Sequence, residues 1–229
     1  MFQDKITDIF FDLDHTLWDF DKNSELAFEK IFKENHPAIN TKLFVDIYAP
    51  INQACWKFYQ VDKLTHDELR YKRLKDSFDA LSYSISDEEI HQMSIDYITY
   101  LPENNILFDG AKEVLDYLNS KYRLHIITNG FAEVQYKKLK NSGISDYFIS
   151  VTNSEKAGVK KPHPKIFEFA LSLANTQKER SIMIGDCIDA DVKGALTFGM
   201  EAIYFNDKNV QISNDIIQVN QLIELKKYF

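Results

Sequence analysis

Short apolar runs alternate with stretches of helical periodicity over most of this chain. The first run, Ile9 to Phe11 with Ile6 before it, is too short for a helix and predicts a strand buried on both faces. Similar runs predict strands, and helical spacing between them predicts helices. The predicted strands are 124–128, 148–151, 181–184 and 201–205; the predicted helices are about 110–120, 131–142, 166–174, 189–198 and a short closing helix near 222–225. This alternation predicts an α/β fold with a doubly wound parallel sheet.

The segment between about Asn23 and Leu101 has a different pattern. Its apolar positions recur at helical spacing, and no strand pattern interrupts them. Thr65 followed by Glu68 is a capping-box pattern that predicts a helix over roughly 66–81; Ser86 and Glu89 predict another over 87–101. We therefore expect an inserted unit of about four helices at 17–105, and a Rossmann-like core at 1–16 and 106–229. The many aromatic residues of the insertion are interpreted mainly as interhelical packing.

Composition narrows the possible partners. The chain has 229 residues and a net charge of −8, with the acidic residues spread along it. Binding to nucleic acid needs a basic surface, so nucleic acid is not an expected partner. No apolar stretch approaches the length of a membrane span, and no secretory signal is recognisable. Cys55 and Cys187 form neither a disulfide framework nor a zinc motif. A cytoplasmic protein that does not bind membranes is the simplest expectation.

Polar residues that could carry chemistry follow the first predicted strand. Asp12 and Asp14 are one residue apart, and Thr16 comes two residues later. Two carboxylates so close repel each other, and a hard, oxygen-binding cation such as Mg²⁺ would relieve that repulsion. A turn or helix cap rich in Asp and Thr is an equally good interpretation of this segment alone.

Three further polar signals follow later strands. Thr128-Asn129-Gly130 offers a hydroxyl and backbone N–H groups to a phosphate, although Asn-Gly is also an ordinary turn. Lys161 precedes Pro162 and could bind an anionic oxygen, or be a solvated surface lysine. Asp186 follows an apolar strand and could be a helix cap. Because the carboxyl ends of parallel strands share one edge, Asp12, Asp14, Thr128, Lys161 and Asp186 are expected to meet there.

The four motifs, taken in order, resemble those of the haloacid dehalogenase superfamily of phosphohydrolases. They are Asp-x-Asp-x-Thr at 12–16, apolar-Thr-Asn-Gly at 127–130, Gly-x-x-Lys-Pro at 158–162 and Gly-Asp-x-x-x-x-Asp at 185–191. The resemblance covers the whole chain, since the helical insertion looks like the cap domain of that superfamily. Lys161 is preferred to Lys160 because it directly precedes Pro162. The segments 11–20 and 128–131 look most like the bacterial pyrimidine 5′-nucleotidases of this superfamily.

The resemblance implies a mechanism. Asp12 would be the nucleophile that forms an aspartyl-phosphate, and Asp14 the general acid and base. Mg²⁺ would be bound by the side chains of Asp12 and Asp186 and by the backbone carbonyl of Asp14. The phosphoryl oxygens would be held by Thr128, Asn129 and Lys161, with Asp191 orienting the groups around Lys161 or a metal-bound water. The cap would close over the site and select the leaving group.

The expected substrate is a small phosphate monoester, in particular a pyrimidine nucleoside monophosphate. A phosphoglycolate or sugar-phosphate phosphatase and a phosphomutase keep the same motifs and stay open as alternatives. A haloacid dehalogenase is disfavoured, because releasing halide needs neither a metal nor a proton donor. A non-catalytic binding protein would be favoured by a missing motif residue, and none is missing. Monomer and homodimer are equally compatible with the sequence.

Overall fold

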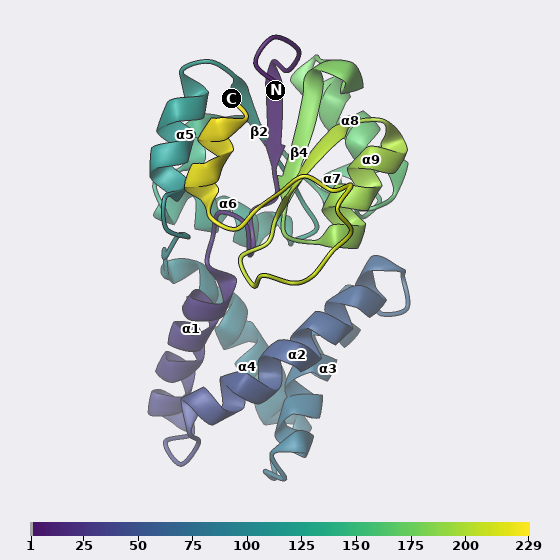
Figure 1. Ribbon diagram of the computed structural model, residues 1–229. Coiled ribbons are helices and arrows are strands. Elements are labelled where there is room, and N and C mark those ends of the chain that lie inside the picture. The colour runs from purple at the N-terminus through teal and green to yellow at the C-terminus, as the bar shows by residue number, and fades with distance from the viewer. Residues whose placement is uncertain (1) are drawn as a thin grey trace. The chain divides into compact units, whose positions relative to one another are not determined.

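The computed structural model describes residues 2–229, which form two compact units (Figure 1). The core unit runs to Asp19 and resumes at Ile106, and the helical unit is Phe20–Asn105. The first boundary lies three residues beyond the predicted one. The reason is a pair of backbone hydrogen bonds between the two connecting segments: Asp19 N donates to Ile106 O at 3.1 Å, and Phe108 N donates to Leu17 O at 3.0 Å. These bonds hold residues 17–19 on the core unit.

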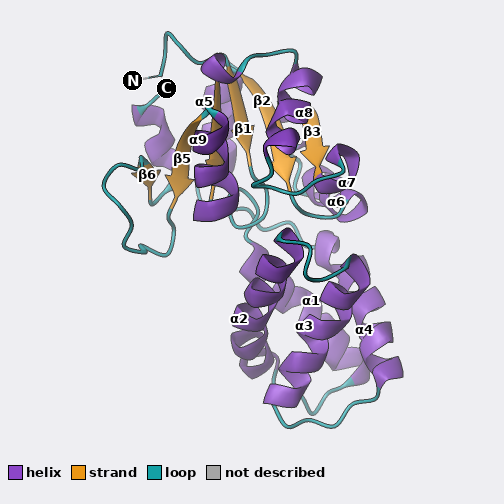
Figure 2. Cartoon of the chain, turned by 90° about the vertical axis from the view of Figure 1, so that its right-hand side faces the viewer, coloured by secondary structure: helices purple, strands orange, loops and turns teal. Residues whose placement is uncertain are grey.

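The core unit contains a parallel sheet, six-stranded within the described residues (Figure 2). Its spatial order is β3-β2-β1-β4-β5-β6. The strands are β1 (Asp8–Phe11), β2 (Arg123–Thr128), β3 (Phe148–Asn153), β4 (Ser181–Gly185), β5 (Glu201–Phe205) and β6 (Gln218–Val219). The chain winds outward from β1 in one direction through β2 and β3, and in the other through β4 to β6. This confirms the predicted doubly wound fold. The two-residue β6 was not predicted, because it has no apolar run.

Helices cover both faces of the sheet (Figures 1 and 2). On one face Phe10 and Met183 pack with Ile166 and Phe167 of α8. The other face carries α5, which contacts β2 and the C-terminal segment. Burial on both faces explains why the central strands are apolar at consecutive positions. The helices of the core unit are α5 (Ala111–Asn119), α6 (Ala132–Asn141), α7 (Ser154–Ala157), α8 (Pro164–Ala174) and α9 (Gly194–Phe198).

The predicted helix 189–198 is divided in the structure. Residues Ile188–Lys193 form a wide π-helical turn, η4, and α9 follows it. The backbone N–H groups of Asp191 and Val192 both donate to the carbonyl of Cys187, at 2.9 and 3.3 Å. The predicted closing helix is likewise a 3₁₀ segment, η5 (Leu222–Lys227). Single turns of π-helix are common at functional sites, and this one carries Asp191.

The helical unit, Phe20–Asn105, contains the four predicted helices and a short 3₁₀ turn, η1 (Leu101–Glu103). The helices are α1 (Phe20–Asn35), α2 (Thr41–Gln60), α3 (His66–Ala80) and α4 (Asp87–Tyr100). Both predicted capping boxes, at Thr65 and Ser86, are present. Aromatic rings fill the interior; those of Phe28 and Tyr97, for example, stack at 4.6 Å. Interhelical packing therefore accounts for much of the aromatic content of this unit, as expected.

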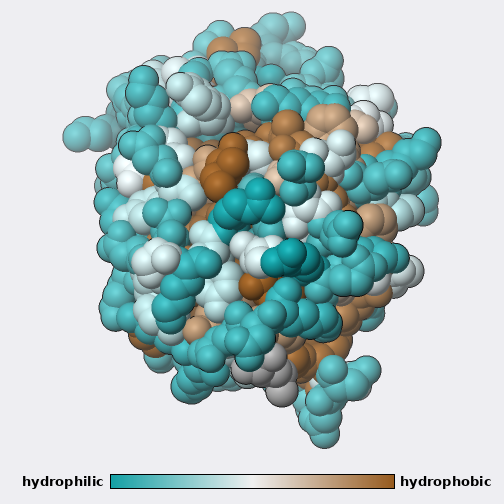
Figure 3. All heavy atoms as spheres, turned by 90° about the horizontal axis from the view of Figure 1, so that it is seen from above, coloured by the Kyte–Doolittle hydropathy of each residue, from teal (hydrophilic) through white to brown (hydrophobic). Residues whose placement is uncertain are grey.

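The face of the molecule in Figure 3 is covered mainly by hydrophilic residues, with hydrophobic ones exposed in small groups between them. Such a surface agrees with the polar, acidic composition of the chain. Among residues 2–229, no helix combines the length and the apolar character that crossing a membrane requires.

Candidate active site

The site lies at the carboxyl ends of β1 and β4, the two neighbouring strands from which the chain winds in opposite directions. In doubly wound sheets this switch point is where ligands bind. Asp12 follows β1 directly, and its backbone N–H donates to Ile184 O of β4 at 2.9 Å. Asp186 follows β4 directly and accepts a hydrogen bond from the Thr16 hydroxyl at 3.3 Å. The strand register thus brings together two carboxylates that are 174 residues apart in the sequence.

Lys161 supplies the positive charge of this site. Its side chain is only 2% exposed, and its Nζ lies 2.6 Å from Asp12 Oδ1 and 2.6 Å from Asp191 Oδ1. It also donates to the carbonyl of Ile127, at the end of β2, at 2.7 Å. The Asn129 side chain fixes the Lys161 backbone by accepting from its N–H at 2.7 Å and donating to its carbonyl at 3.0 Å. It is Lys161, the residue preferred over Lys160, that reaches Asp12.

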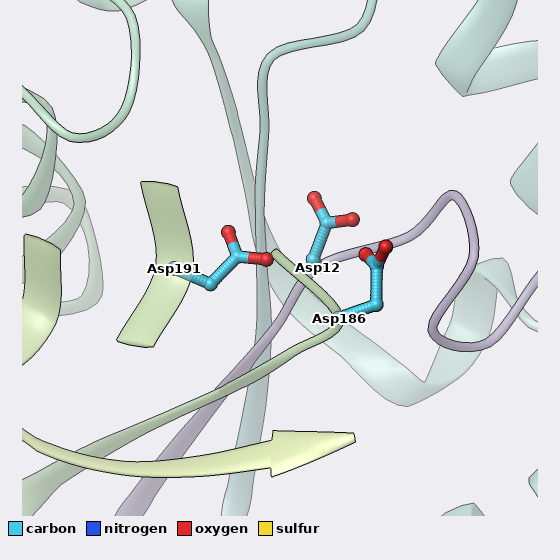
Figure 4. A group of neighbouring side chains, drawn as sticks. All are labelled: Asp12, Asp186 and Asp191. Carbon is cyan, nitrogen blue, oxygen red and sulfur yellow. The ribbon is translucent and has the colours of Figure 1, made fainter. Parts of the chain in front are cut away.

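Three carboxyl groups converge at this edge (Figure 4). One oxygen each of Asp12, Asp186 and Asp191 lies within 4.8 Å of the others. Asp191 is fixed by a second bond, because its Oδ2 accepts from Cys187 N at 3.0 Å. Gly185 makes room for it: a Cβ there would lie 2.3 Å from Asp191 Oδ2. The sequence predicts charge repulsion between Asp12 and Asp14, whereas the carboxylates whose oxygens gather around that of Asp12 are those of Asp186 and Asp191.

The electrostatics of this group favour a bound cation. Burial and, to a smaller extent, the neighbouring Asp191 carboxylate raise the pKa of Asp12 to about 7, against the opposing effect of the Lys161 ammonium. Loss of solvent and the Asp12 and Asp191 carboxylates also hold the pKa of Asp186 well above its usual value. Burial disfavours the Lys161 ammonium, yet the two carboxylates beside it keep its pKa above the usual value. Three carboxyl groups share one ammonium, so the group is rich in oxygen ligands and lacks positive charge. Such a set of ligands fits Mg²⁺.

Asp14 lies in a separate environment, although it is only two residues from Asp12. The chain turns around the carbonyl of Leu13, which accepts from Leu17 N and Trp18 N at 3.0 and 2.9 Å. His15 adopts a left-handed conformation at φ +61° within this turn. The turn directs the Asp14 carboxylate to α6, where Oδ1 lies 2.5 Å from Lys138 Nζ.

Thr128 and Gln135 connect this second environment to the end of β2. Gln135 Nε2 donates to Asp14 Oδ2 at 2.8 Å and to Thr128 Oγ1 at 2.8 Å. The Thr128 hydroxyl also accepts from Gly130 N at 3.0 Å. Gly130 leaves room for Gln135 in this position, since a Cβ on Gly130 would lie 1.8 Å from Gln135 Nε2.

The four sequence motifs do not contain the contact residues Gln135 and Lys138. Both lie on α6, three residues apart, and both are almost fully buried. A lysine in an amphipathic helix is ordinarily assigned to the solvent face, so composition gave no reason to select Lys138. The available signal was the spacing, because residues i and i+3 of the helix that follows Thr-Asn-Gly share one face.

Comparison with known proteins agrees with this architecture. A family model described as haloacid dehalogenase-like hydrolase matches residues 8–199. The chain is 32% identical over 205 residues to pyrimidine 5′-nucleotidase PynA of Streptococcus pneumoniae, covering 89% of this chain and 85% of that protein. It is 31% identical to pyrimidine 5′-nucleotidase YjjG of Escherichia coli, covering 86% and 85% of the two chains.

The solved structures agree as well. The magnesium-bound crystal structure of a HAD-hydrolase, YfnB of Bacillus subtilis, superimposes with a TM-score of 0.87 at 27% identity and covers 98% of both chains. The resemblance drawn from the four sequence motifs is thereby confirmed. From its matched residues and its relatives, the chain belongs to the haloacid dehalogenase-like hydrolases.

Proposed function

We propose that this protein is a Mg²⁺-dependent phosphomonoester hydrolase that acts through an aspartyl-phosphate on Asp12. The observation that carries the proposal is the division of the site into two environments. Asp12 is one of a group of three carboxylates and pairs with Lys161, whereas Asp14 lies outside that group and pairs with Lys138. One environment suits a nucleophile and a cation, and the other suits a proton-transfer group.

In the first half-reaction, a carboxylate oxygen of Asp12 attacks the phosphorus atom. The bond from phosphorus to the leaving oxygen breaks, and Asp14 gives its proton to that oxygen. Lys161, which is 2.6 Å from Asp12, would balance the charge of the transferring phosphoryl group. Thr128 and Asn129 would bind its oxygens, and Asp191 would hold the Lys161 ammonium in place.

In the second half-reaction, water attacks the phosphorus atom of the aspartyl-phosphate. Asp14 takes the proton of that water, the phosphorus–oxygen bond to Asp12 breaks, and inorganic phosphate leaves. The side chains of Asp12 and Asp186 and the backbone carbonyl of Asp14 would hold Mg²⁺. The ion would supply positive charge that offsets the negative charge of the carboxylates and the phosphoryl oxygens.

The proposed substrates are pyrimidine nucleoside 5′-monophosphates. Support comes from the two relatives named pyrimidine 5′-nucleotidase, which are 32% and 31% identical over most of the chain. A triose or sugar phosphate is the second candidate. It is favoured by a relative named glyceraldehyde 3-phosphate phosphatase from Pyrococcus abyssi, 32% identical over 202 residues.

A substrate panel tests the proposal. Phosphate release is measured from uridine and cytidine monophosphates, glyceraldehyde 3-phosphate, phosphoglycolate and p-nitrophenyl phosphate, each with Mg²⁺ and with a chelator. The expected result is Mg²⁺-dependent turnover with the highest kcat/KM on a pyrimidine nucleotide. A preference for glyceraldehyde 3-phosphate would select the second candidate. No release from any phosphate ester would contradict the phosphatase assignment.

A further inference from the structure

Helix α6 holds both oxygens of the Asp14 carboxylate. Lys138 Nζ lies 2.5 Å from Oδ1, and Gln135 Nε2 lies 2.8 Å from Oδ2. Lys138 is 2% exposed and Gln135 is 1% exposed, whereas the Asp14 side chain that they hold is 21% exposed. The Lys138 ammonium also lies 4.2 Å from the centroid of the buried Trp18 ring, which stabilises a cation there. The position of the Asp14 carboxyl group is therefore set by buried side chains.

Gln135 also determines which hydrogen bond the Thr128 hydroxyl can make. The NH₂ group of Gln135 faces Asp14 and donates to its Oδ2. The same NH₂ group donates to Thr128 Oγ1, and Gly130 N donates to it as well. A hydroxyl has two lone pairs and one proton. Both lone pairs of Thr128 are thus occupied, and its proton is directed to an acceptor outside this network.

We infer that Gln135 and Lys138 are positioning residues for hydrolysis. Lys138 holds Asp14 where it can transfer a proton to the leaving oxygen. Gln135 holds Asp14 and also makes Thr128 a hydrogen-bond donor toward a phosphoryl oxygen. This inference rests on the proposed function, and it adds two residues that none of the four sequence motifs contains.

The two residues have different expected effects, because their partners act on different parts of the substrate. Asp14 acts on the leaving oxygen, and a nitrophenolate departs without a proton, whereas a nucleoside alkoxide needs one. Loss of Lys138 should therefore affect a nucleotide more than p-nitrophenyl phosphate. Thr128 acts on the phosphoryl group, which the two substrates share. Loss of Gln135 should consequently affect both substrates.

The first test measures kcat/KM, which reports the steps up to formation of the aspartyl-phosphate, for uridine 5′-monophosphate and p-nitrophenyl phosphate. In Lys138→Met the value for the nucleotide should fall about 10²-fold, the size expected when a proton-transfer group loses its alignment. The value for p-nitrophenyl phosphate should fall several times less. Lys138→Arg should recover part of the nucleotide activity. The matched control is Lys137→Met, since the neighbouring Lys137 is half-exposed and pairs with Glu133 on the outer face of α6.

The second test uses Gln135→Met and the isosteric Gln135→Glu. In Gln135→Met, kcat/KM should fall on both substrates by about tenfold or more, the equivalent of one oriented hydrogen bond. Gln135→Glu should fall further, because it directs a second carboxylate at Asp14. Gln92→Met is the control, since the exposed Gln92 binds only Asp96 on α4 among the contacts of the described residues. Circular dichroism and thermal unfolding of every variant separate loss of fold from loss of positioning.

A merely structural role for Lys138 would lower kcat/KM equally on both substrates, and this result would overturn its assignment. Nucleotide activity in Lys138→Met equal to that of Lys137→Met would overturn it as well. Unchanged activity in both Gln135 variants would overturn the assignment of Gln135. These failures can occur while the wild-type enzyme hydrolyses both substrates, so they leave the proposed function intact. An inactive wild-type enzyme would overturn both.

Discussion

The Lys161 ammonium lies between two carboxylates in the interior of the core unit. It contacts Asp12 and Asp191 at 2.6 Å each, and its side chain is 2% exposed. Removing one partner of a buried ion pair leaves the other charge uncompensated, which typically costs about 3–5 kcal/mol. We therefore propose two roles for Lys161, one in stability and one in binding the phosphoryl group.

For Lys161→Met we predict a lower free energy of unfolding, by about 3 kcal/mol or more, together with loss of phosphatase turnover. Denaturant unfolding and phosphate release measure the two effects. Lys160→Met is the matched control and should change both quantities much less, because the ammonium that lies 2.6 Å from Asp12 Oδ1 is that of Lys161. Equal effects of the two substitutions would show that the buried ammonium is not the feature that matters.

Asp8 lies at the start of β1, at the end of the strand opposite Asp12. It is the centre of a second cluster of buried polar side chains. Its carboxylate contacts His125 at 3.0 Å and Arg123 at 2.7 Å, and accepts from the Thr176 hydroxyl at 2.8 Å. Burial alone would raise its pKa, but the hydrogen bonds from His125 and the other donors outweigh it and hold the pKa of Asp8 well below its usual value.

This lowered pKa makes stability depend on pH. In the acid range the unfolded chain binds a proton on Asp8 at a higher pH than the folded chain does, so stability rises with pH there. The contribution is complete above the ordinary aspartate pKa of about 3.9 and is lost progressively as pH falls below it. We predict that Asp8→Asn reduces the slope of unfolding free energy against pH between about 5 and 3. Asp4→Asn, at an exposed position, is the control; a wild-type slope in Asp8→Asn would refute the prediction.

Also at the residue scale, the sequence could indicate which polar residues follow the strands. It could not indicate which of their side chains lie together and which lie apart. Asp12, Lys161 and Asp186 meet because the strand ends of one parallel sheet share an edge. The separation of Asp14 from Asp12 depends on the turn around Leu13 and on the left-handed His15. Neither is visible in a residue pattern, and strict strand spacing would have put both carboxylates on one side.

At the scale of elements, the two segments that follow β1 and β4 bring three carboxylates together. Asp12, Asp186 and Asp191 lie within 4.8 Å of one another, and burial with mutual repulsion raises the pKa of Asp12 to about 7. Such an arrangement is unfavourable without added positive charge. A cation that binds the folded state alone should therefore stabilise it.

We predict that Mg²⁺ raises the unfolding temperature of the wild-type protein. At about 100 times the Kd, binding to the folded state adds about 2.7 kcal/mol of stability. Asp186→Asn should lose most of that increase, which differential scanning calorimetry with and without Mg²⁺ measures. An exposed carboxylate on the adjacent turn, Asp189, provides the control as Asp189→Asn. An equal Mg²⁺ shift in Asp186→Asn and wild type would place the ion elsewhere.

Most elements could be predicted from the sequence because local chemistry defines them. The capping boxes at Thr65 and Ser86 define two helix starts, and consecutive apolar residues define the central strands. The elements that differ are those set by tertiary contacts. The π-helical turn η4 depends on two N–H groups sharing the Cys187 carbonyl, and β6 pairs with β5 without an apolar run of its own.

At the scale of the whole molecule, the chain leaves the core unit after Asp19 and returns at Ile106. These two residues are hydrogen-bonded to each other at 3.1 Å, and Trp18 forms a bridge with Leu107 beside them. The ends that a deletion of the helical unit would leave are therefore adjacent. Closing so short a gap carries a small entropic cost.

We predict that a chain in which a short Gly-Ser linker replaces residues 20–105 still folds cooperatively. The core unit keeps its sheet and its own buried cluster between the sheet and α8. Calorimetry and near-ultraviolet circular dichroism check for a single transition and fixed tertiary packing. A broad, non-cooperative transition would show that the core unit requires the helical unit to fold.

In the proposed mechanism, Asp12 carries the phosphoryl group during hydrolysis. The most direct test mixes enzyme and Mg²⁺ with uridine 5′-monophosphate labelled in its phosphate, and quenches with acid on the millisecond scale. We expect label on the protein chain, released by hydroxylamine as an acyl phosphate would be, and absent from a folded Asp12→Asn variant. Release of phosphate with no labelled chain, or equal labelling of Asp12→Asn, would contradict this mechanism.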